Sequence, residues 1–257
     1  MAAARITKLC QQLSPRTPGP QRRRHAAAAG GGGDDAVSAA ASSAVATPAA
    51  RLRVAAICST YNPLQHADVI VTKFLKGIST DDGFRAPEVD VVSIWIDCVL
   101  EQDIGLHLAK QHNVPVFATI KQAMECGTGS LSVDAVLLVG EHGDYPHNER
   151  GRHQYPRRYF FEQITGVLAE NKKSVPIFID KHFAYSTTDA LWMWERASVL
   201  GIPLMAGSSI PTLWRSPSFV EHPLEVELES AISLGYGSSP KGGPEAYGFH
   251  ALEALQW

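Results

Sequence analysis

The segment from Val136 to Arg158 concentrates side chains that can bind a metal ion or an anion and can move protons. It reads VLLVGEHGDYPHNERGRHQYPRR, so an apolar run and a glycine precede the polar groups. The chemically capable side chains that follow include Glu141, His142, Asp144, His147, Asn148 and His153. Carboxylates and imidazoles suit divalent ions such as Zn²⁺ or Mn²⁺, and both can serve as acids or bases. This composition makes the segment the first candidate for a functional site.

Glu141, His142 and Asp144 are the candidate ligands of a divalent metal ion. The residues that could complete the coordination shell are His147, His153 and His182. Their spacing matches no strong metal motif such as H-E-x-x-H. The alternative is a hydrogen-bonded loop, since GDYPHN contains the Gly, Asp, Pro and Asn of ordinary turns. The sequence leaves both interpretations open.

Lys181 stands between Asp180 and His182, directly after a second apolar run, SVPIFID. A lysine that is partly buried beside another cation can lose its proton near neutral pH and act as a general acid or base. The alternative is a lysine held in a salt bridge. His182 could relay a proton or cap a loop. We expect Lys181, His182 and Glu141 to be the catalytic residues.

Further polar groups could bind a small-molecule substrate. Arg157 and Arg158 open a predicted helix, where an arginine could hold a carboxylate or phosphate through two hydrogen bonds or lie on a solvated face. The stretch GSSIP, residues 207–211, offers hydroxyl and N–H groups to an anion or a sugar, or is a plain turn. The candidate substrate-binding residues are Asp144, Tyr145, Asn148, Arg157, Ser208 and Ser209.

Alternating apolar runs and amphipathic stretches predict the elements that position these residues. Short runs rich in Val and Ile predict six strands, at residues 51–59, 89–97, 114–119, 133–140, 174–180 and 202–207. Helical spacing of apolar residues predicts helices at 65–77, 101–112, 120–127, 155–173 and 186–201. The runs do not alternate polar and apolar residues, so both faces of the sheet should be covered. The pattern predicts an α/β fold with a doubly wound, mostly parallel, Rossmann-like sheet of about six strands.

Ligands of such a sheet bind at the carboxyl ends of its strands. Residues 141–148 and 180–182 each follow one of these ends. Neighbouring parallel strands present their carboxyl ends on one edge of the sheet. We therefore expect Glu141 and Lys181 to meet at one site.

The composition is that of an ordinary globular protein. The chain is 45% hydrophobic and 19% charged, with a formal net charge of −3, so nothing in the charge balance favours nucleic acid or an anionic membrane as partner. No apolar stretch approaches the roughly 20 residues that span a bilayer. The cysteines form no C-x-x-C pair and are expected to be reduced thiols of an intracellular protein. They are Cys10, Cys58, Cys98 and Cys126.

Residues 1–50 differ from the rest in composition. They are rich in Ala, Gly, Ser and Pro and lack apolar periodicity, so we expect a disordered leader. The leader is basic and free of acids before Asp34, which is typical either of an organelle transit peptide or of a low-complexity segment. We expect the protein in the cytoplasm, or in a mitochondrion or plastid if the leader is a transit peptide. Residues 51–215 should form the α/β domain, and residues 216–257 an extension or the start of a second domain.

The order of the predicted elements resembles the nucleotide-binding half of the Gfo/Idh/MocA-type oxidoreductases. The stretch IFIDKHFAYSTTDALWMWERASVLGIPLMAG lies where that family has its EKP motif, a helix and the sixth strand, and QHADVIVTKFL is similar to the family's first helix. The resemblance covers about Arg51 to Trp214. It implies an NAD(P) cofactor, and it implies that Lys181 lies next to the substrate and the nicotinamide.

The first turn departs from the family pattern. ICSTYNP stands where a glycine-rich G-x-G-x-x-G turn would let a pyrophosphate approach the backbone. Ser59, Thr60 and Asn62 could contact phosphate through their side chains, whereas Tyr61 looks obstructive. The candidate acid for a ribose hydroxyl is Asp97.

Three functions remain open on these grounds. The first is an NAD(P)-dependent oxidoreductase that acts on a sugar- or polyol-like substrate. The second is a metal-dependent hydrolase or lyase built on Glu141, His142, Asp144 and His182. The third is a nucleotide-binding domain without catalytic activity. Each implies a small-molecule partner, and the oligomeric state stays open.

Overall fold

A parallel sheet positions the polar segments described above. The computed structural model describes residues 50–210, 226–235 and 243–256. Within these ranges one sheet has five strands, in the order β4-β1-β5-β6-β7. The strands are β1 (Leu52–Cys58), β4 (Val89–Ile96), β5 (Ala135–Val139), β6 (Ile177–Asp180) and β7 (Leu204–Gly207). The predicted leader, apart from Ala50, and the predicted domain boundary at residue 215 lie outside the described residues.

The strand order reverses at β1. This strand pairs in parallel with β4 on one side and with β5 on the other. The chain then continues outward from β5 to β6 and β7, again with parallel pairing. The sheet is therefore doubly wound, as predicted, and the carboxyl ends of β1 and β5 flank the switch point where such folds bind ligands.

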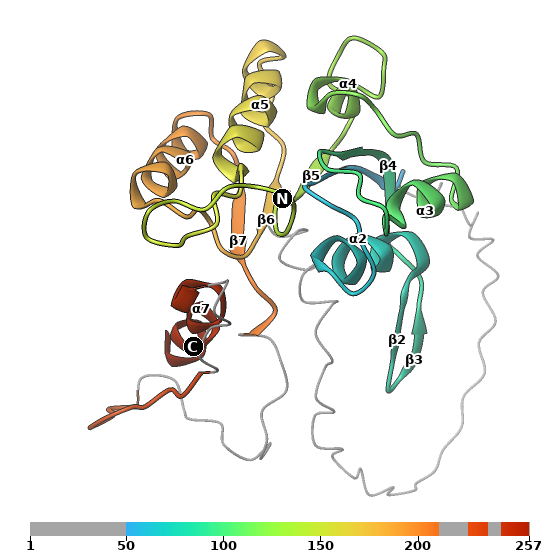
Figure 1. The fold of residues 1–257 in the computed structure, drawn as a ribbon. Helices are drawn as coiled ribbons and strands as arrows, with labels where there is room; N and C mark the ends of the chain where they lie inside the picture. The colour runs from blue at the N-terminus through green and yellow to red at the C-terminus, as the bar shows by residue number, and fades with distance from the viewer. Residues whose placement is uncertain (1–49, 211–225, 236–242, 257) are drawn as a thin grey trace, which may run out of the picture. The chain divides into compact units, whose positions relative to one another are not determined.

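Helices cover both faces of the sheet. On one face, Ile57, Leu138 and Ile179 pack with Phe160 and Ile164. This layer consists of α4 (Ile120–Glu125), α5 (Arg157–Glu170) and α6 (Thr187–Val199). The opposite layer consists of α2 (His66–Lys76) and α3 (Gly105–Gln111). Figure 1 shows α5 and α6 on one side of the strands and α2 on the other. The five helices agree with the predicted ones.

The third predicted strand is wrong. Residues 114–119 form a single parallel bridge, Ile94 to Val116, in place of a strand. The bridge holds through two hydrogen bonds, from Ile94 N to Pro115 O at 3.0 Å and from Phe117 N to Ile94 O at 2.9 Å. Pro115 has no N–H to donate, and this segment lies at the edge of the sheet beyond β4. A proline at a sheet edge thus reduces the strand to one bridge.

A hairpin and a C-terminal helix complete the described elements. A small antiparallel hairpin, β2 (Ile78–Thr80) and β3 (Gly83–Arg85), follows α2. A further helix, α7 (Gly243–Gln256), lies within the residues that we expected to form an extension or the start of a second domain. No helix among the described residues is long and apolar enough to cross a membrane.

Candidate active site at the carboxyl edge of the sheet

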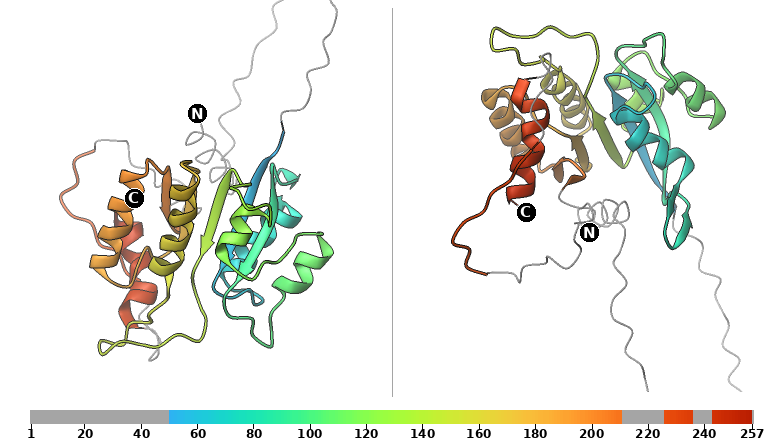
Figure 2. Two further views of the ribbon diagram at one scale, coloured as in Figure 1. Left: turned by 90° about the horizontal axis from the view of Figure 1, so that it is seen from above. Right: turned by 60° about the horizontal axis from the view of Figure 1, so that its bottom comes forward.

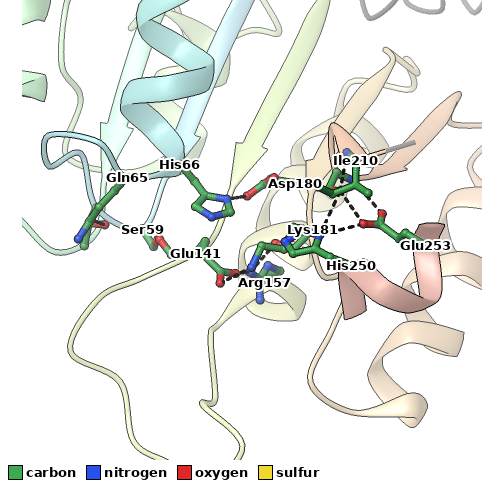
Figure 3. A network of polar contacts seen from close by, with 12 residues as sticks. Ser59, Gln65, His66, Glu141, Arg157, Asp180, Lys181, Ile210, His250 and Glu253 are labelled. Atoms are coloured by element: carbon green, nitrogen blue, oxygen red, sulfur yellow. Dashed lines mark hydrogen bonds and ion pairs between the residues drawn. The ribbon is translucent and has the colours of Figure 1, made fainter. Parts of the chain in front are cut away.

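Three buried charged residues form an ion-pair network at the ends of β5 and β6. Lys181 Nζ donates a hydrogen bond to Glu141 Oε1 at 2.9 Å, and Arg157 Nη2 forms an ion pair with Glu141 Oε2. Arg157 Nη2 also donates to the carbonyl oxygen of Lys181 at 2.8 Å. Figure 3 shows these side chains together. The prediction that the two polar segments meet is confirmed by the Lys181–Glu141 contact.

The network keeps Glu141 ionised. Burial raises the pKa of Glu141, but the positive charges of Arg157 and Lys181 outweigh it and bring this pKa down to about 2. All three residues are at most 5% exposed. A buried carboxylate that faces two cations is electrically compensated, whereas loss of the carboxylate leaves both cations without their counterion.

A second polar contact crosses the sheet next to this network. His66, the first residue of α2, contacts the Asp180 carboxylate at the end of β6 through Nδ1. The His142 ring lies edge-on to the His66 ring, with centroids 5.2 Å apart. Because β5 separates β1 from β6, the His66–Asp180 contact reaches over the carboxyl end of β5. Figure 3 shows it beside Glu141 and Lys181.

His182 is a neutral imidazole at the same edge. Burial and then the positive charge of Arg157 lower the pKa of His182 to about 4. Its Nδ1 atom is buried and has no hydrogen-bond partner among the described residues. The rings of Tyr155 and Phe249 lie 6.4 Å and 6.0 Å from its ring. A neutral imidazole carries a proton on one ring nitrogen and can accept a proton on the other.

The C-terminal helix reaches this edge through Ser208. Ser208 N and Oγ donate to the two carboxylate oxygens of Glu253, at 3.1 Å and 2.5 Å, and His250 Nδ1 lies 3.1 Å from the second oxygen. Ser208 follows β7, so Glu253 fastens α7 to the end of that strand. This contact puts Phe249 against His182.

The predicted phosphate-binding side chains point inward. Ser59 Oγ donates to the carbonyl oxygen of Glu141 at 2.6 Å, and Thr60 Oγ1 donates to Gln65 Oε1 at 3.0 Å. Asn62 is 5% exposed, and its Oδ1 atom lacks a partner in the part of the chain that the structure describes. Ser59 and Thr60 are at most 1% exposed as whole residues, so these side chains are not free to contact a phosphate as the sequence predicted.

Tyr61 does not obstruct the site, contrary to our expectation. Its side chain is fully buried and lies in the core with Val71 and Leu108. Its hydroxyl group is 2.9 Å from Thr72 Oγ1. The ring occupies the space where a Cβ atom on Gly105 would sit, 2.7 Å away, so a glycine at the start of α3 is what admits it.

Asp97 lies at the carboxyl end of β4, as a ribose-binding acid should. Its side chain is exposed, and its Oδ2 atom accepts a hydrogen bond from the Tyr145 hydroxyl at 2.7 Å. Cys98 Sγ lies 3.5 Å from the same hydroxyl. Tyr145 thus contacts a predicted cofactor residue, although the sequence assigned it to the substrate.

The remaining candidate substrate-binding residues differ in their contacts and in their exposure. Asn148 Oδ1 accepts hydrogen bonds from the backbone N–H groups of Arg150 and Arg152, at 3.0 Å and 2.9 Å, and so closes a turn. Ser209 is exposed next to the half-buried Ser208. Arg157 is fully buried, so the alternative of a solvated helix face is wrong for it, and it applies to the half-exposed Arg158.

The candidate metal ligands are not gathered into one site. Across residues 50–210, 226–235 and 243–256, no group of three or more His, Cys, Asp or Glu residues could hold a metal ion. Asp144 is exposed, while Glu141 is turned into the ion-pair network. His147 and His153 stack on each other with ring centroids 4.3 Å apart. The loop interpretation therefore describes these residues better than the metal interpretation does.

Sequence reasoning missed three contributors to this edge. His66, His250 and Glu253 were not among the candidates. Two signals were available: His66 opens the first helix after β1, and His250 and Glu253 are three residues apart, which places them on one face of α7.

Comparisons with known proteins bear on the fold. No protein-family model matches the chain, and no curated protein matches it. Among solved structures, GenD2 from gentamicin A biosynthesis in complex with NAD is 18% identical, with a TM-score of 0.40, and the match covers 61% of this chain and 34% of GenD2. UDP-N-acetylglucosamine 3-dehydrogenase GnnA from Acidithiobacillus ferrooxidans is 12% identical, with a TM-score of 0.39 and coverages of 63% and 39%.

A third similar structure is biliverdin reductase from Synechocystis in complex with biliverdin and NADP⁺. It is 13% identical, with a TM-score of 0.39 and coverages of 62% and 38%. The chain thus spans less than two fifths of the length of each of these structures. The likeness to GenD2 and GnnA is at low identity and covers part of each chain.

Proposed function

We propose that the chain is the nucleotide-binding part of an NAD(P)-dependent oxidoreductase that acts on a sugar- or polyol-like substrate. The observation that carries this proposal is the buried Lys181–Glu141–Arg157 network at the ends of β5 and β6. It lies beside the point where the strand order reverses, which is where doubly wound folds bind dinucleotides. Buried charges at such an edge are costly for folding, and a role in chemistry accounts for them.

The residues at this edge fit a dinucleotide at several points. Asp97 is exposed at the end of β4 and would accept a ribose hydroxyl. The N-cap of α2, Gln65, makes no side-chain capping hydrogen bond within the described residues. Free N–H groups in the first turn of that helix would therefore meet the pyrophosphate. Leu64 has a φ of 60°, a left-handed conformation that usually favours glycine. The residue is 88% exposed and is turned away from the core.

Lys181 and His182 would manage the proton of the reaction. A bound nicotinamide would exchange a hydride with the substrate carbon. In the direction of oxidation the substrate hydroxyl also loses its proton, and the neutral His182 ring would receive it on its unprotonated nitrogen. Lys181 would donate a hydrogen bond to the oxygen that becomes the carbonyl, and Glu141 would hold the Lys181 side chain in place.

Calorimetric titration with NADH and NADPH tests the cofactor. Binding of either nucleotide in the micromolar range, followed by its oxidation or reduction with a panel of sugars, polyols and their acids, is the expected result. Failure of both nucleotides to bind at millimolar concentration would exclude the oxidoreductase function. Binding without turnover of any substrate would favour the nucleotide-binding domain without catalytic activity.

A further inference from the structure

The loop between β5 and α5, residues 140–156, reaches across the sheet to the end of β4. Both views of Figure 2 show it as a long yellow-green loop. The contact is the hydrogen bond from the Tyr145 hydroxyl to Asp97 Oδ2, 2.7 Å long. Because β1 lies between β4 and β5, this bond passes over the carboxyl end of β1. The proposed path of the dinucleotide crosses the same strand end.

The loop is built around the Tyr145 ring. Gly143 has a φ of +124°, and a Cβ atom there would come within 2.3 Å of the ring, so only glycine admits this arrangement. The ring also lies edge-on to His153 and Tyr155, with centroids 6.3 Å and 6.1 Å away. The position of Tyr145 is therefore set by its own loop.

The Tyr145 hydroxyl is a persistent donor. Burial, and after it the hydrogen bonds with Cys98 and Asp97, raise the pKa of Tyr145, so the phenol keeps its proton throughout the physiological range. Asp97 Oδ2 accepts the hydrogen bond from Tyr145, and a ribose hydroxyl would approach the same carboxylate as a donor. Tyr145 and the ribose are therefore competitors for Asp97.

We propose that Tyr145 is the gate of the ribose subsite. In the free protein it holds Asp97 and keeps the loop over the end of β1, and a dinucleotide binds by replacing the phenol with a ribose hydroxyl. Binding would thereby release the middle of a loop whose ends, Glu141 and Arg157, stay fixed in the ion-pair network. This inference rests on the proposed function, because it assumes a nucleotide at that strand end.

The Tyr145→Phe variant tests the gate, since it removes the competing donor and retains the ring. Calorimetry should show NAD and ADP-ribose binding ~3- to 10-fold more tightly than to the wild type, the range expected from one hydrogen bond. Nicotinamide mononucleotide lacks the adenosine ribose, so its affinity should not change. The matched control is Tyr159→Phe, on the exposed face of α5.

A double-mutant cycle with Asp97→Asn locates the effect. If the gate acts through Asp97, Tyr145→Phe should gain much less affinity in the Asp97→Asn background. Amide hydrogen exchange distinguishes the gate from a purely structural role of Tyr145. If Tyr145 is a gate, saturating NAD should speed amide exchange at residues 142–152 of the wild type, whereas a purely structural role predicts no increase.

The outcomes separate the gate from the proposed function. Equal NAD affinity of wild type and Tyr145→Phe, without faster exchange in the loop, would overturn the gate and leave the proposed function standing. If neither protein binds NAD or ADP-ribose, the proposed function fails and the gate fails with it. A dinucleotide that binds the variant alone would support both.

Discussion

Lys181 Nζ lies 2.9 Å from Glu141 Oε1, and this ion pair joins the ends of two neighbouring strands. Arg157 approaches the same carboxylate from the start of α5. The three residues thus connect the two strand ends to a helix in the layer that covers them. Stability and chemistry at this edge depend on the same carboxylate.

Glu141→Gln should destabilise the domain strongly. The substitution leaves Arg157 and Lys181 buried without a counterion, which typically costs about 3–5 kcal/mol. Urea unfolding followed by far-ultraviolet circular dichroism measures the loss. The matched control is Glu170→Gln, because Glu170 pairs with Lys121 on the surface and such exposed pairs contribute little to stability. Equal effects of the two substitutions would contradict the importance of the buried network.

Stability should fall as the pH is lowered from neutrality. His182 has a pKa of about 4 in the folded protein and a normal value near 6.5, so the unfolded chain binds its proton first and stability declines between these values. Glu141 behaves likewise at lower pH, because its pKa falls from an ordinary value of 4.5 in the unfolded chain to about 2 in the folded protein. We expect the thermal midpoint to drop by ~5–10 °C from pH 7 to pH 4.

The His182→Asn variant tests whether His182 causes the loss of stability in the upper part of this pH range. Asparagine does not titrate, so the variant should lose less stability than the wild type between pH 6.5 and pH 4.5. Identical pH profiles would show that other groups, such as His142 and His153, dominate the acid sensitivity. Burial lowers the pKa of both of these histidines as well.

The Glu253–Ser208 contact should hold α7 on the sheet. Glu253→Ala removes the acceptor of two hydrogen bonds from Ser208, and we expect amide exchange in residues 243–256 to accelerate by ~10-fold or more, as fits the loss of about 1–3 kcal/mol. Glu229→Ala is the control, since Glu229 is exposed. Unchanged exchange in α7 would mean that apolar packing, rather than Glu253, secures the helix.

The sheet could be predicted because its central strands, β1 and β5, are buried on both faces and therefore appear as continuous apolar runs. The same logic placed Glu141 and Lys181 together: they follow adjacent parallel strands, and strand direction determines which edge they share. The prediction of the third strand was wrong because the apolar pattern of VPVFAT outweighed its proline. Pro115 has no N–H group to donate, and only one bridge forms there.

Side-chain partners were harder to predict than strand ends. Arg157 and Arg158 are adjacent and identical in type, yet one is fully buried against Glu141 and the other is half-exposed beside Glu162. Their difference depends on the helix phase relative to the sheet, which a sequence does not specify. The His66–Asp180 contact joins residues 114 positions apart and follows only once the strand order is known.

Asp97 should make the protein prefer NAD to NADP. The segment after β4 reads DCVLEQD and carries three acids without a lysine or arginine, so a 2′-phosphate would meet negative charge. Asp97→Ser should narrow the ratio of NADPH to NADH dissociation constants by ~10-fold, about 1.4 kcal/mol. A wild-type protein that binds NADPH more tightly than NADH would refute this assignment.

Lys181→Met addresses catalysis directly. Methionine has a similar length and no charge, and Glu141 keeps Arg157 as its counterion, so the variant should fold and bind nucleotide with unchanged affinity. If Lys181 assists the proton transfer, turnover should fall by the ~10²–10⁴-fold typical of a lost general acid or base. The control is Lys121→Met, because Lys121 lies half-exposed on the surface of α4. Wild-type turnover by Lys181→Met would show that the oxidoreductase mechanism proposed here is wrong, since no other described lysine contacts Glu141.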